Sequence, residues 1–292
     1  MPGNRISSHP MPEPQILLTG LAFGESPRWH AGRLWLANWG TPDIVTVGLD
    51  GESEIAARVP PSIPCSIDWL PDGRLLVVSG RTARVLHAKD DGPLAVHADL
   101  SGLGSVFNEI VVDGRGDAYV NGGPDPAPGG QDAGSGIIAL VRPDGSARQV
   151  ADGIAFGNGM AITADGSTLI VAESWGNRLT AFDIAADGSL SGRRVWASIP
   201  GGFPDGICLD ADGAVWYADV PGQQCARVRE GGEVVQAIDL DRDCFACMLG
   251  GPDRRTLFML AAEWRGFEHM TGPERTGQVL ICDAPAPGSG RP

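Results

Sequence analysis

Polar side chains recur at one position of a repeating hairpin along this chain of 292 residues. Each hairpin turns at a glycine, or at Arg254 in the last copy. The position of interest lies eight residues before the turn, or seven in the first copy, and holds Glu25, Cys65, Asn108, Asn158, Asp205 and Ala246. Carboxylate and amide oxygens are the ligands that calcium, magnesium and manganese prefer. The alternative is a polar, water-filled channel in which these groups hydrogen-bond to each other.

The spacing of the turns predicts how these side chains are positioned. The turn residues stand 41 to 50 residues apart and are Gly32, Gly73, Gly116, Gly166, Gly213 and Arg254. A short apolar run follows each of them, and further turns such as Asp50-Gly51 and Asp144-Gly145 lie between the copies. Four short strands per unit and six units indicate an all-β fold, a six-bladed β-propeller with four-stranded antiparallel blades. Equivalent loops of a propeller converge on its central channel, so we expect a metal site there.

Composition supports one domain. The 42 glycines and 23 prolines suit a chain that turns every 8 to 12 residues, and no long stretch has the apolar period of a helix. We expect a flexible leader over residues 1–14, a propeller over 15–283 and a flexible tail over 284–292. The run 15–18 is predicted to close the ring by pairing with 278–282, and the loop 122–135 to be a surface excursion or part of a lid.

Charge and cysteine content exclude several classes of function. The net charge of −14 is unsuited to nucleic acid or to an anionic membrane surface, so neither is an expected partner. Residues 1–14 lack the apolar core of a signal peptide, and a cytoplasmic location is expected. Cys244 and Cys247 form a lone C-x-x-C without a second pair, which argues against structural zinc. Cys65, Cys208, Cys225 and Cys282 are predicted to be buried thiols of a reduced protein.

Three segments resemble those of a known family. They match, in order, the signature segments of the senescence marker protein (regucalcin), gluconolactonase and luciferin-regenerating enzyme family, and the similarity extends from about Gly24 to Cys282. The segments are Gly24-Glu25-Ser26-Pro27-Arg28-Trp29, Gly157-Asn158-Gly159-Met160, and Pro204-Asp205-Gly206-Ile207 with Asp210, Gly213 and Trp216.

The resemblance implies one catalytic divalent cation in the channel, held by Glu25, Asn158 and Asp205. Asn108 matches a position that contacts substrate in the family. Calcium is the first expectation for the cation, with manganese, magnesium or zinc as alternatives. The implied activity is hydrolysis of a small-molecule lactone or a related ester, and other members hydrolyse aryl esters or phosphotriesters.

The chemistry follows once the cation is granted. A divalent cation polarises a carbonyl and lowers the pKa of a bound water. Asp205 is the better candidate for general base, because the neighbouring Gly206 leaves room for a substrate. Glu25 then mainly fixes the cation. Asn108 is expected to hold the ring oxygen or the developing oxyanion through its amide hydrogens.

One departure from the family bears on the substrate. The family's sugar lactonases have an arginine two residues before this asparagine, whereas this chain has Val106. Without the N–H donors of an arginine guanidinium at this position, we expect the substrate to be a less hydroxylated lactone or an aryl ester. The predicted substrate contacts are Asn108, Glu109, Phe107 and Trp175. For each aromatic residue the alternative is packing between blades, and Glu109 is either a group that orients Asn108 or an exposed charge.

A different class of function is also compatible with the sequence. A propeller can bind calcium or a partner protein without catalysis, with a purely structural ion in its channel. The sequence does not determine the physiological substrate, the cation or the oligomeric state.

Overall fold

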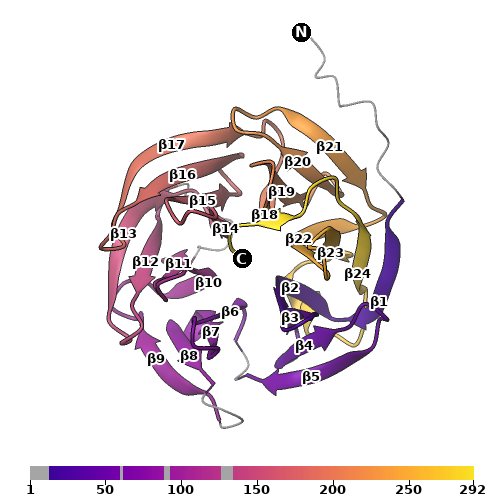
Figure 1. The fold of residues 1–292 in the computed structure, drawn as a ribbon. Coiled ribbons are helices and arrows are strands. Elements are labelled where there is room, and N and C mark those ends of the chain that lie inside the picture. The colour runs from indigo at the N-terminus through magenta and orange to yellow at the C-terminus, as the bar shows by residue number, and fades with distance from the viewer. Residues whose placement is uncertain (1–12, 60–61, 89–92, 126–133) are drawn as a thin grey trace.

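The computed structural model describes residues 13–59, 62–88, 93–125 and 134–292. Its strands form six antiparallel sheets arranged as blades around a central axis (Figure 1). Five sheets have four strands, and the sixth has an added strand at its inner edge. The predicted all-β six-bladed propeller is therefore confirmed. Residues 1–12 of the expected leader and residues 126–133 of the 122–135 loop lie outside the described residues.

In blades 1 to 5 the strands follow one another along the chain, from the channel outward, whereas blade 6 takes its outermost strand from the start of the chain. Blade 1 contains β2 (Phe23–His30), β3 (Arg33–Trp39), β4 (Asp43–Val47) and β5 (Ser53–Arg58). Blade 2 contains β6 (Cys65–Trp69), β7 (Leu75–Ser79), β8 (Arg84–His87) and β9 (Ala95–Asp99). Blade 3 contains β10 (Val106–Val112), β11 (Ala118–Gly123), β12 (Gly136–Val141) and β13 (Ala147–Ile154).

The other three blades repeat this order. Blade 4 contains β14 (Gly157–Ile162), β15 (Thr168–Glu173), β16 (Arg178–Ile184) and β17 (Leu190–Ser198). Blade 5 contains β18 (Pro204–Asp210), β19 (Val215–Asp219), β20 (Gln224–Val228) and β21 (Val234–Asp239). Blade 6 contains β22 (Asp243–Gly250), β23 (Thr256–Ala262), β24 (Gly277–Asp283) and β1 (Gln15–Leu21).

The ring closes by pairing the first strand with the last blade. β1 runs antiparallel to β24, with Gln15 opposite Ile281 and Thr19 opposite Gln278. This confirms the predicted closure. Pairing the two ends of the chain satisfies backbone groups that an open edge strand would leave available for aggregation.

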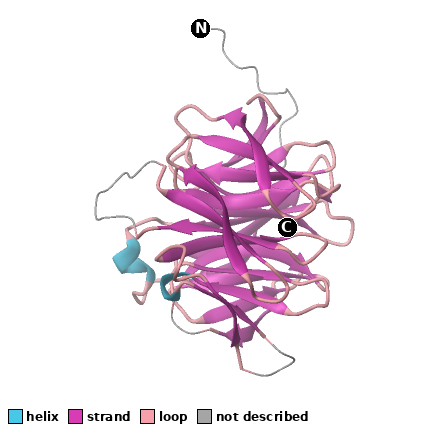
Figure 2. Cartoon of the chain, turned by 90° about the vertical axis from the view of Figure 1, so that its left-hand side faces the viewer, coloured by secondary structure: helices cyan, strands magenta, loops and turns pink. Residues whose placement is uncertain are grey.

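The two faces of the propeller differ. The short helix α1 (Phe267–Met270) and the 3₁₀ turn η1 (Gly80–Thr82) lie at one face, and the C-terminus lies at the other (Figure 2). We expected residues 284–292 to be a flexible tail, but β25 (Gly288–Ser289) pairs with the end of β18, and Arg291 bridges Ile162 at the end of β14. The C-terminal segment thus pairs with the ends of two innermost strands.

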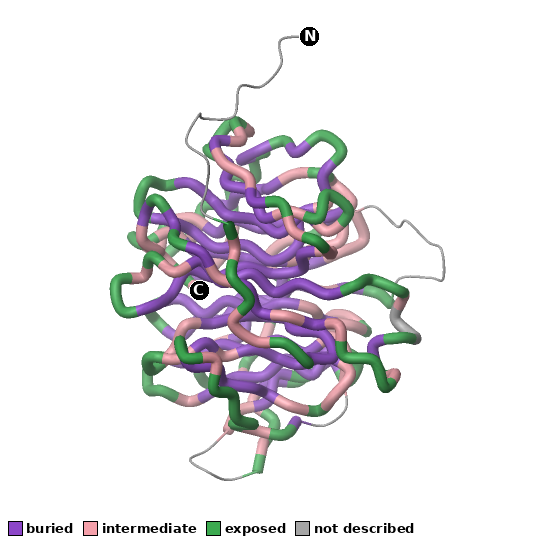
Figure 3. The backbone as a smooth tube through the Cα atoms, turned by 90° about the vertical axis from the view of Figure 1, so that its right-hand side faces the viewer, coloured by how far each residue is buried: buried purple, intermediate pink, exposed green. Residues whose placement is uncertain are grey.

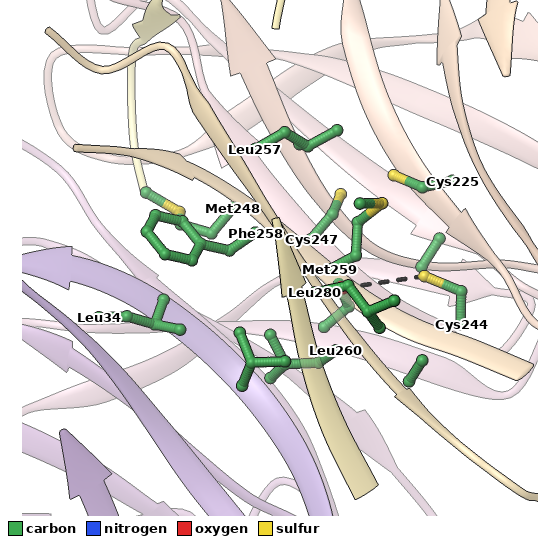
Figure 4. Close-up of a cluster of buried hydrophobic side chains, with 14 of the residues drawn as sticks. Leu34, Cys225, Cys244, Cys247, Met248, Leu257, Phe258, Met259, Leu260 and Leu280 are labelled. Atoms are coloured by element: carbon green, nitrogen blue, oxygen red, sulfur yellow. Dashed lines mark hydrogen bonds between the residues drawn. The ribbon is translucent and has the colours of Figure 1, made fainter. Parts of the chain in front are cut away.

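The apolar side chains pack between the blades. Buried backbone fills the middle of the molecule, and exposed residues gather at the turns (Figure 3). One cluster spans blades 5, 6 and 1, and Figure 4 labels Phe258, Met259 and three of its cysteines. All six cysteines are buried and free, which confirms the prediction made for Cys65, Cys208, Cys225 and Cys282. Among the described residues, no helix is both long enough and apolar enough to cross a membrane.

A buried ion pair braces the hairpin of blade 5. Arg227 on β20 lies 2.6 Å from Asp210 at the end of β18 and 2.8 Å from Asp212 in the turn. Asp210 also accepts hydrogen bonds from the backbone amides of Asp212 and Ala214. The guanidinium therefore holds the turn aspartates of the third signature segment in place.

We predict that Arg227→Met lowers the free energy of unfolding by about 3–5 kcal/mol, because Asp210 would keep a buried charge without its cation. The measurement is denaturant unfolding. The matched control is Arg229→Met, which removes an exposed pair with Glu233 and should cost under about 1 kcal/mol. Equal losses for the two variants would contradict this account.

Candidate functional site

The four polar residues singled out in the sequence lie at irregularities of innermost strands. In each of these strands the regular pairing with the neighbouring strand is interrupted by a shift in register. The shifts fall between Glu25 and Arg28 in β2, Phe107 and Ile110 in β10, Gly157 and Met160 in β14, and Pro204 and Ile207 in β18. Ser26, next to Glu25, has a left-handed backbone with φ 50°. Bulges and strained backbone of this kind re-aim side chains and are common beside functional sites.

The carboxylates of Glu25 and Asp205 are buried close together. Their residues are 7% and 6% exposed. Burial, followed by the charges of Asp205 and Glu109, raises the pKa of Glu25 well above its usual range. Burial, followed by the charge of Glu109, raises the pKa of Asp205 in the same way. Two carboxylates in this arrangement repel each other unless a proton or a cation joins them.

The two asparagines are hydrogen-bonded to each other. Asn108 Nδ2 donates to Asn158 Oδ1 at 3.1 Å and to the carbonyl of Gly157 at 3.3 Å. Asn158 Nδ2 donates to Ser174 Oγ at 3.4 Å, so the amide oxygen of Asn158 is turned toward Asn108. Blades 3 and 4 are thereby linked at this end of the channel.

Further contacts connect the remaining blades of the site. Ser174 Oγ donates to the carbonyl of Pro204, the residue before Asp205, at 2.8 Å. Gly159 lies so close to β18 that a Cβ there would stand 2.6 Å from the carbonyl oxygen of Asp205. On the other side, Ser26 Oγ donates to Glu109 at 3.0 Å. The starts of β2, β10, β14 and β18 therefore surround one site.

Glu109 is part of this site and is not an exposed charge. The residue is 7% exposed, and its Oε1 accepts from Ser26 Oγ, from Arg28 at 3.1 Å and from the amide of Ile110 at 2.8 Å. Arg28 also extends toward Asp68, with 3.9 Å between Nε and the carboxylate. Burial raises the pKa of Glu109 although Arg28 lowers it. The guanidinium of Arg28 compensates Glu109, and Glu25 and Asp205 have no basic side chain hydrogen-bonded to them among the described residues.

The donor set fits a hard divalent cation. Asp205 Oδ1 is buried and has no hydrogen-bond partner among the described residues. It is accompanied by a second carboxylate, Glu25, and by neutral amide oxygens on Asn158 and Asn108. Such oxygen ligands suit calcium, magnesium or manganese. Within the described part of the chain, no group of three or more His, Cys, Asp or Glu side chains is placed to hold a metal ion, and the candidate set combines two carboxylates with amide oxygens.

The two aromatic residues predicted to contact substrate, Phe107 and Trp175, differ in burial. Phe107 is fully buried and packs in the core between blades 2 and 3, which favours the packing alternative over the predicted substrate contact. Trp175 is half-buried and stacks on Phe156 with 4.5 Å between the rings. It stays a candidate contact. Cys65 and Ala246, the remaining channel positions, are both buried.

Sequence reasoning missed Asn121. Its Nδ2 donates to the carbonyl of Asn158 at 2.6 Å, and its Oδ1 accepts from the amide of Glu109 at 3.2 Å. It therefore fixes two site residues on different strands. The feature of the sequence that could have identified Asn121 is its position as a polar residue directly after the apolar run Ala118-Tyr119-Val120. Arg28 and Ser26 lay inside the first signature segment, but nothing in the sequence identified Glu109 as their partner.

The fold and this site define a six-bladed propeller with an oxygen-rich centre at one end of its channel. The sequence profile of the SMP-30/gluconolactonase/LRE-like region matches residues 23–263, and the chain belongs to that family. The resemblance noted from the three signature segments is thus confirmed.

Individual relatives are more distant. A pentonolactonase of Haloferax volcanii is 26% identical over 278 residues, which cover 91% of this chain and 90% of that protein. Regucalcin of Xenopus laevis is 30% identical over 132 residues, and this match spans 44% of each chain. The crystal structure of regucalcin from Agrobacterium tumefaciens, described as a calcium-binding protein, superposes with a TM-score of 0.78 at 21% identity, covering 98% of both chains.

We predict that the metal-free protein loses stability as the pH rises. The folded state binds the protons of Glu25 and Asp205 more tightly than the unfolded state does, since both pKa values are raised on folding. This contribution is complete below the ordinary pKa values of 4.5 and 3.8 and is lost as the pH rises through the raised pKa values of the folded protein. Each tenfold difference in proton affinity between the two states corresponds to about 1.4 kcal/mol.

Asp205→Asn should flatten this pH dependence in the presence of a chelator, and added calcium should stabilise the wild type more than the variant. The readout is the free energy of unfolding between pH 5 and 8. If wild type and variant gave parallel pH profiles in chelator, the paired-carboxylate description would be incorrect.

Proposed function

We propose that this protein is a divalent-metal-dependent hydrolase that opens lactones or cleaves related esters. The observation that carries the proposal is the pair of buried carboxylates, Glu25 and Asp205, with the unpartnered Asp205 Oδ1 beside the amide of Asn158. The similarity to a pentonolactonase over nine-tenths of both chains supports the reaction class. The similarity to a calcium-binding regucalcin supports calcium as the cation, with manganese, magnesium or zinc as alternatives.

Glu25, Asn158 and Asp205 would hold the cation. When bound, it would polarise the carbonyl of the substrate and make a water molecule easier to deprotonate. Glu25 contributes charge and position, because the amide of Ser26 donates to its Oε2 at 3.2 Å. Asn158 contributes a neutral oxygen, so the ligand set carries two negative charges.

Asp205 is the proposed general base. Its Oδ1 has no hydrogen-bond partner among the described residues, so one carboxylate oxygen would hold the cation while the other accepts a proton from a neighbouring water. Burial raises the pKa of Asp205, and a bound cation would lower it again, so that the carboxylate would be ionised and able to accept the proton. Gly206 packs against Ala246, where an added Cβ would lie 2.7 Å from the Ala246 Cα, so the backbone beside Asp205 is fixed in place.

Asn108 is proposed to position the substrate. Its Nδ2 donates both hydrogens within the protein, to the Asn158 side chain and the Gly157 carbonyl, so a substrate would have to replace one of these acceptors. An amide donor here is suited to the ring oxygen of a lactone or to the oxyanion that develops during attack. Trp175 is proposed as an apolar contact near the same end of the channel.

The second candidate function is calcium binding without catalysis, which the similarity to regucalcin favours. The two candidates differ in turnover. To separate them, we would assay a panel of γ- and δ-lactones, aryl esters and an organophosphate, first with chelator and then with calcium, manganese or zinc. Turnover that needs the metal supports the hydrolase and identifies the ester class, and tight metal binding without turnover supports the alternative.

We predict that Asp205→Asn lowers kcat by about 10²–10⁴-fold, the range for loss of a general base. Steady-state kinetics at saturating metal measures the loss, and circular dichroism checks the fold. Asp239→Asn, an exposed aspartate at the end of β21, is the matched control and should leave kcat unchanged. Retention of most activity by Asp205→Asn would remove Asp205 as the base.

We further predict that Glu25→Gln weakens calcium binding at least tenfold while Asp239→Asn does not, because loss of one of two carboxylate ligands removes half the negative charge of the set. Isothermal titration calorimetry gives the dissociation constants. Equal affinities for Glu25→Gln and wild type would exclude Glu25 as a ligand.

A further inference from the structure

A cavity opens near the candidate site. It has a volume of about 340 Å³ and lies between blades 1 and 2. Its lining includes Ala37 and Trp39 from the end of β3, Ile63 and Cys65 from the start of blade 2, and Thr271 from the loop after α1. We call this cavity the blade 1–2 pocket. Ligand pockets usually range from about 300 to 1,000 Å³, so this one has room for a single substituent.

Two residues that line the pocket adjoin or belong to the ring of channel positions. Ala37 is the direct pairing partner of Glu25 in the β2–β3 ladder. Cys65 is the blade 2 equivalent of Glu25 and stands at the first position of β6. Burial and the charge of Glu109 raise the pKa of Cys65 to about 12, so the thiol is neutral and lies near the site carboxylates. The inner wall of the pocket is therefore formed by neighbours of the candidate ligands.

The inner wall offers carbon and few free polar atoms. Trp39 Nε1 donates to the carbonyl of Cys65 at 2.6 Å. Asn38 Oδ1 accepts from the amides of Ala22 and Phe23 at 3.0 and 3.1 Å. Trp39 Nε1 and Asn38 Oδ1 thus bond within the protein. A hydroxyl placed here would lose its hydrogen bonds to water at a cost of about 1–3 kcal/mol, whereas a hydrocarbon would lose none.

The outer rim of the pocket differs from its inner wall. Arg81 from η1 lies there and pairs with Asp125 at 3.1 Å, and both side chains are more than half exposed. Gly40 lies against the carbonyl of Met270, so the loop after β23 packs directly on the β3–β4 turn and forms one side of the pocket. Thr271, at the end of α1, is exposed on this side.

We infer that the blade 1–2 pocket receives an apolar substituent of the substrate, so that the preferred substrates are alkyl- or aryl-substituted lactones rather than sugar lactones. This inference rests on the proposed function, because it takes the reacting carbonyl to lie at Glu25, Asn158 and Asp205.

The first experiment compares γ-butyrolactone, γ-decalactone, a phenyl-substituted γ-lactone and glucono-δ-lactone at saturating calcium. The value of kcat/KM should rise at least about tenfold from γ-butyrolactone to γ-decalactone, mainly through a lower KM, because each methylene in an apolar pocket can contribute about 10-fold or more. Glucono-δ-lactone should be the poorest substrate. Turnover without dependence on chain length, or a preference for glucono-δ-lactone, would overturn the inference and leave the proposed function standing.

The second experiment fills the pocket from its edge with Thr271→Trp. The ratio of kcat/KM for γ-decalactone to that for γ-butyrolactone should fall about tenfold. Thr19→Trp, at an exposed position of β1 outside the pocket lining, is the matched control and should keep the wild-type ratio. An unchanged ratio in Thr271→Trp would overturn the inference.

A binding measurement separates failure of the inference from failure of the proposed function. If no lactone is hydrolysed with any metal, the proposed function fails, and calorimetric titration with γ-decalactone and γ-butyrolactone then tests the pocket alone. Tighter binding of γ-decalactone that Thr271→Trp weakens would support an apolar binding site. Equal binding of the two lactones, or no effect of the variant, would exclude it.

Discussion

The repulsion between two buried carboxylates is the constraint on which the rest of this site depends. Glu25 and Asp205 lie in the channel with raised pKa values, and Asp205 Oδ1 has no hydrogen-bond partner among the described residues. A fold normally avoids such a pair, because each charge loses its hydration and neither gains a counter-charge. The nearest guanidinium, Arg28, is committed to Glu109 and Asp68. A divalent cation between the carboxylates would relieve the cost of burying them.

The surrounding structure holds these groups in place. Each of the four polar residues lies where its innermost strand departs from regular pairing, and the side chains of Ser26, Asn121 and Ser174 join the irregular segments across blades. Site residues from four blades therefore depend on contacts that cross between blades. Ala37 lines the blade 1–2 pocket and pairs with Glu25, so the proposed chemistry and the proposed substrate preference involve adjacent residues.

The sequence predicted the blades and the members of the ring because both follow from one repeat. Turn residues at regular spacing define equivalent positions, and equivalent positions of a propeller meet at the channel. The same logic could not predict contacts between different blades. Glu109 is a buried partner of Arg28 from two blades away, and Phe107 packs in the core one residue from Asn108. The C-terminal segment, which pairs through Gly288 and Ser289, lies outside the repeat altogether.

The most direct test of the account is a crystal structure of the protein grown with calcium or manganese, with the ion located by anomalous scattering. The account predicts one ion at the channel end, with side-chain oxygens of Glu25, Asn158 and Asp205 within about 2.3–2.6 Å of calcium. An ion bound elsewhere, or these three side chains directed away from a common centre, would contradict it.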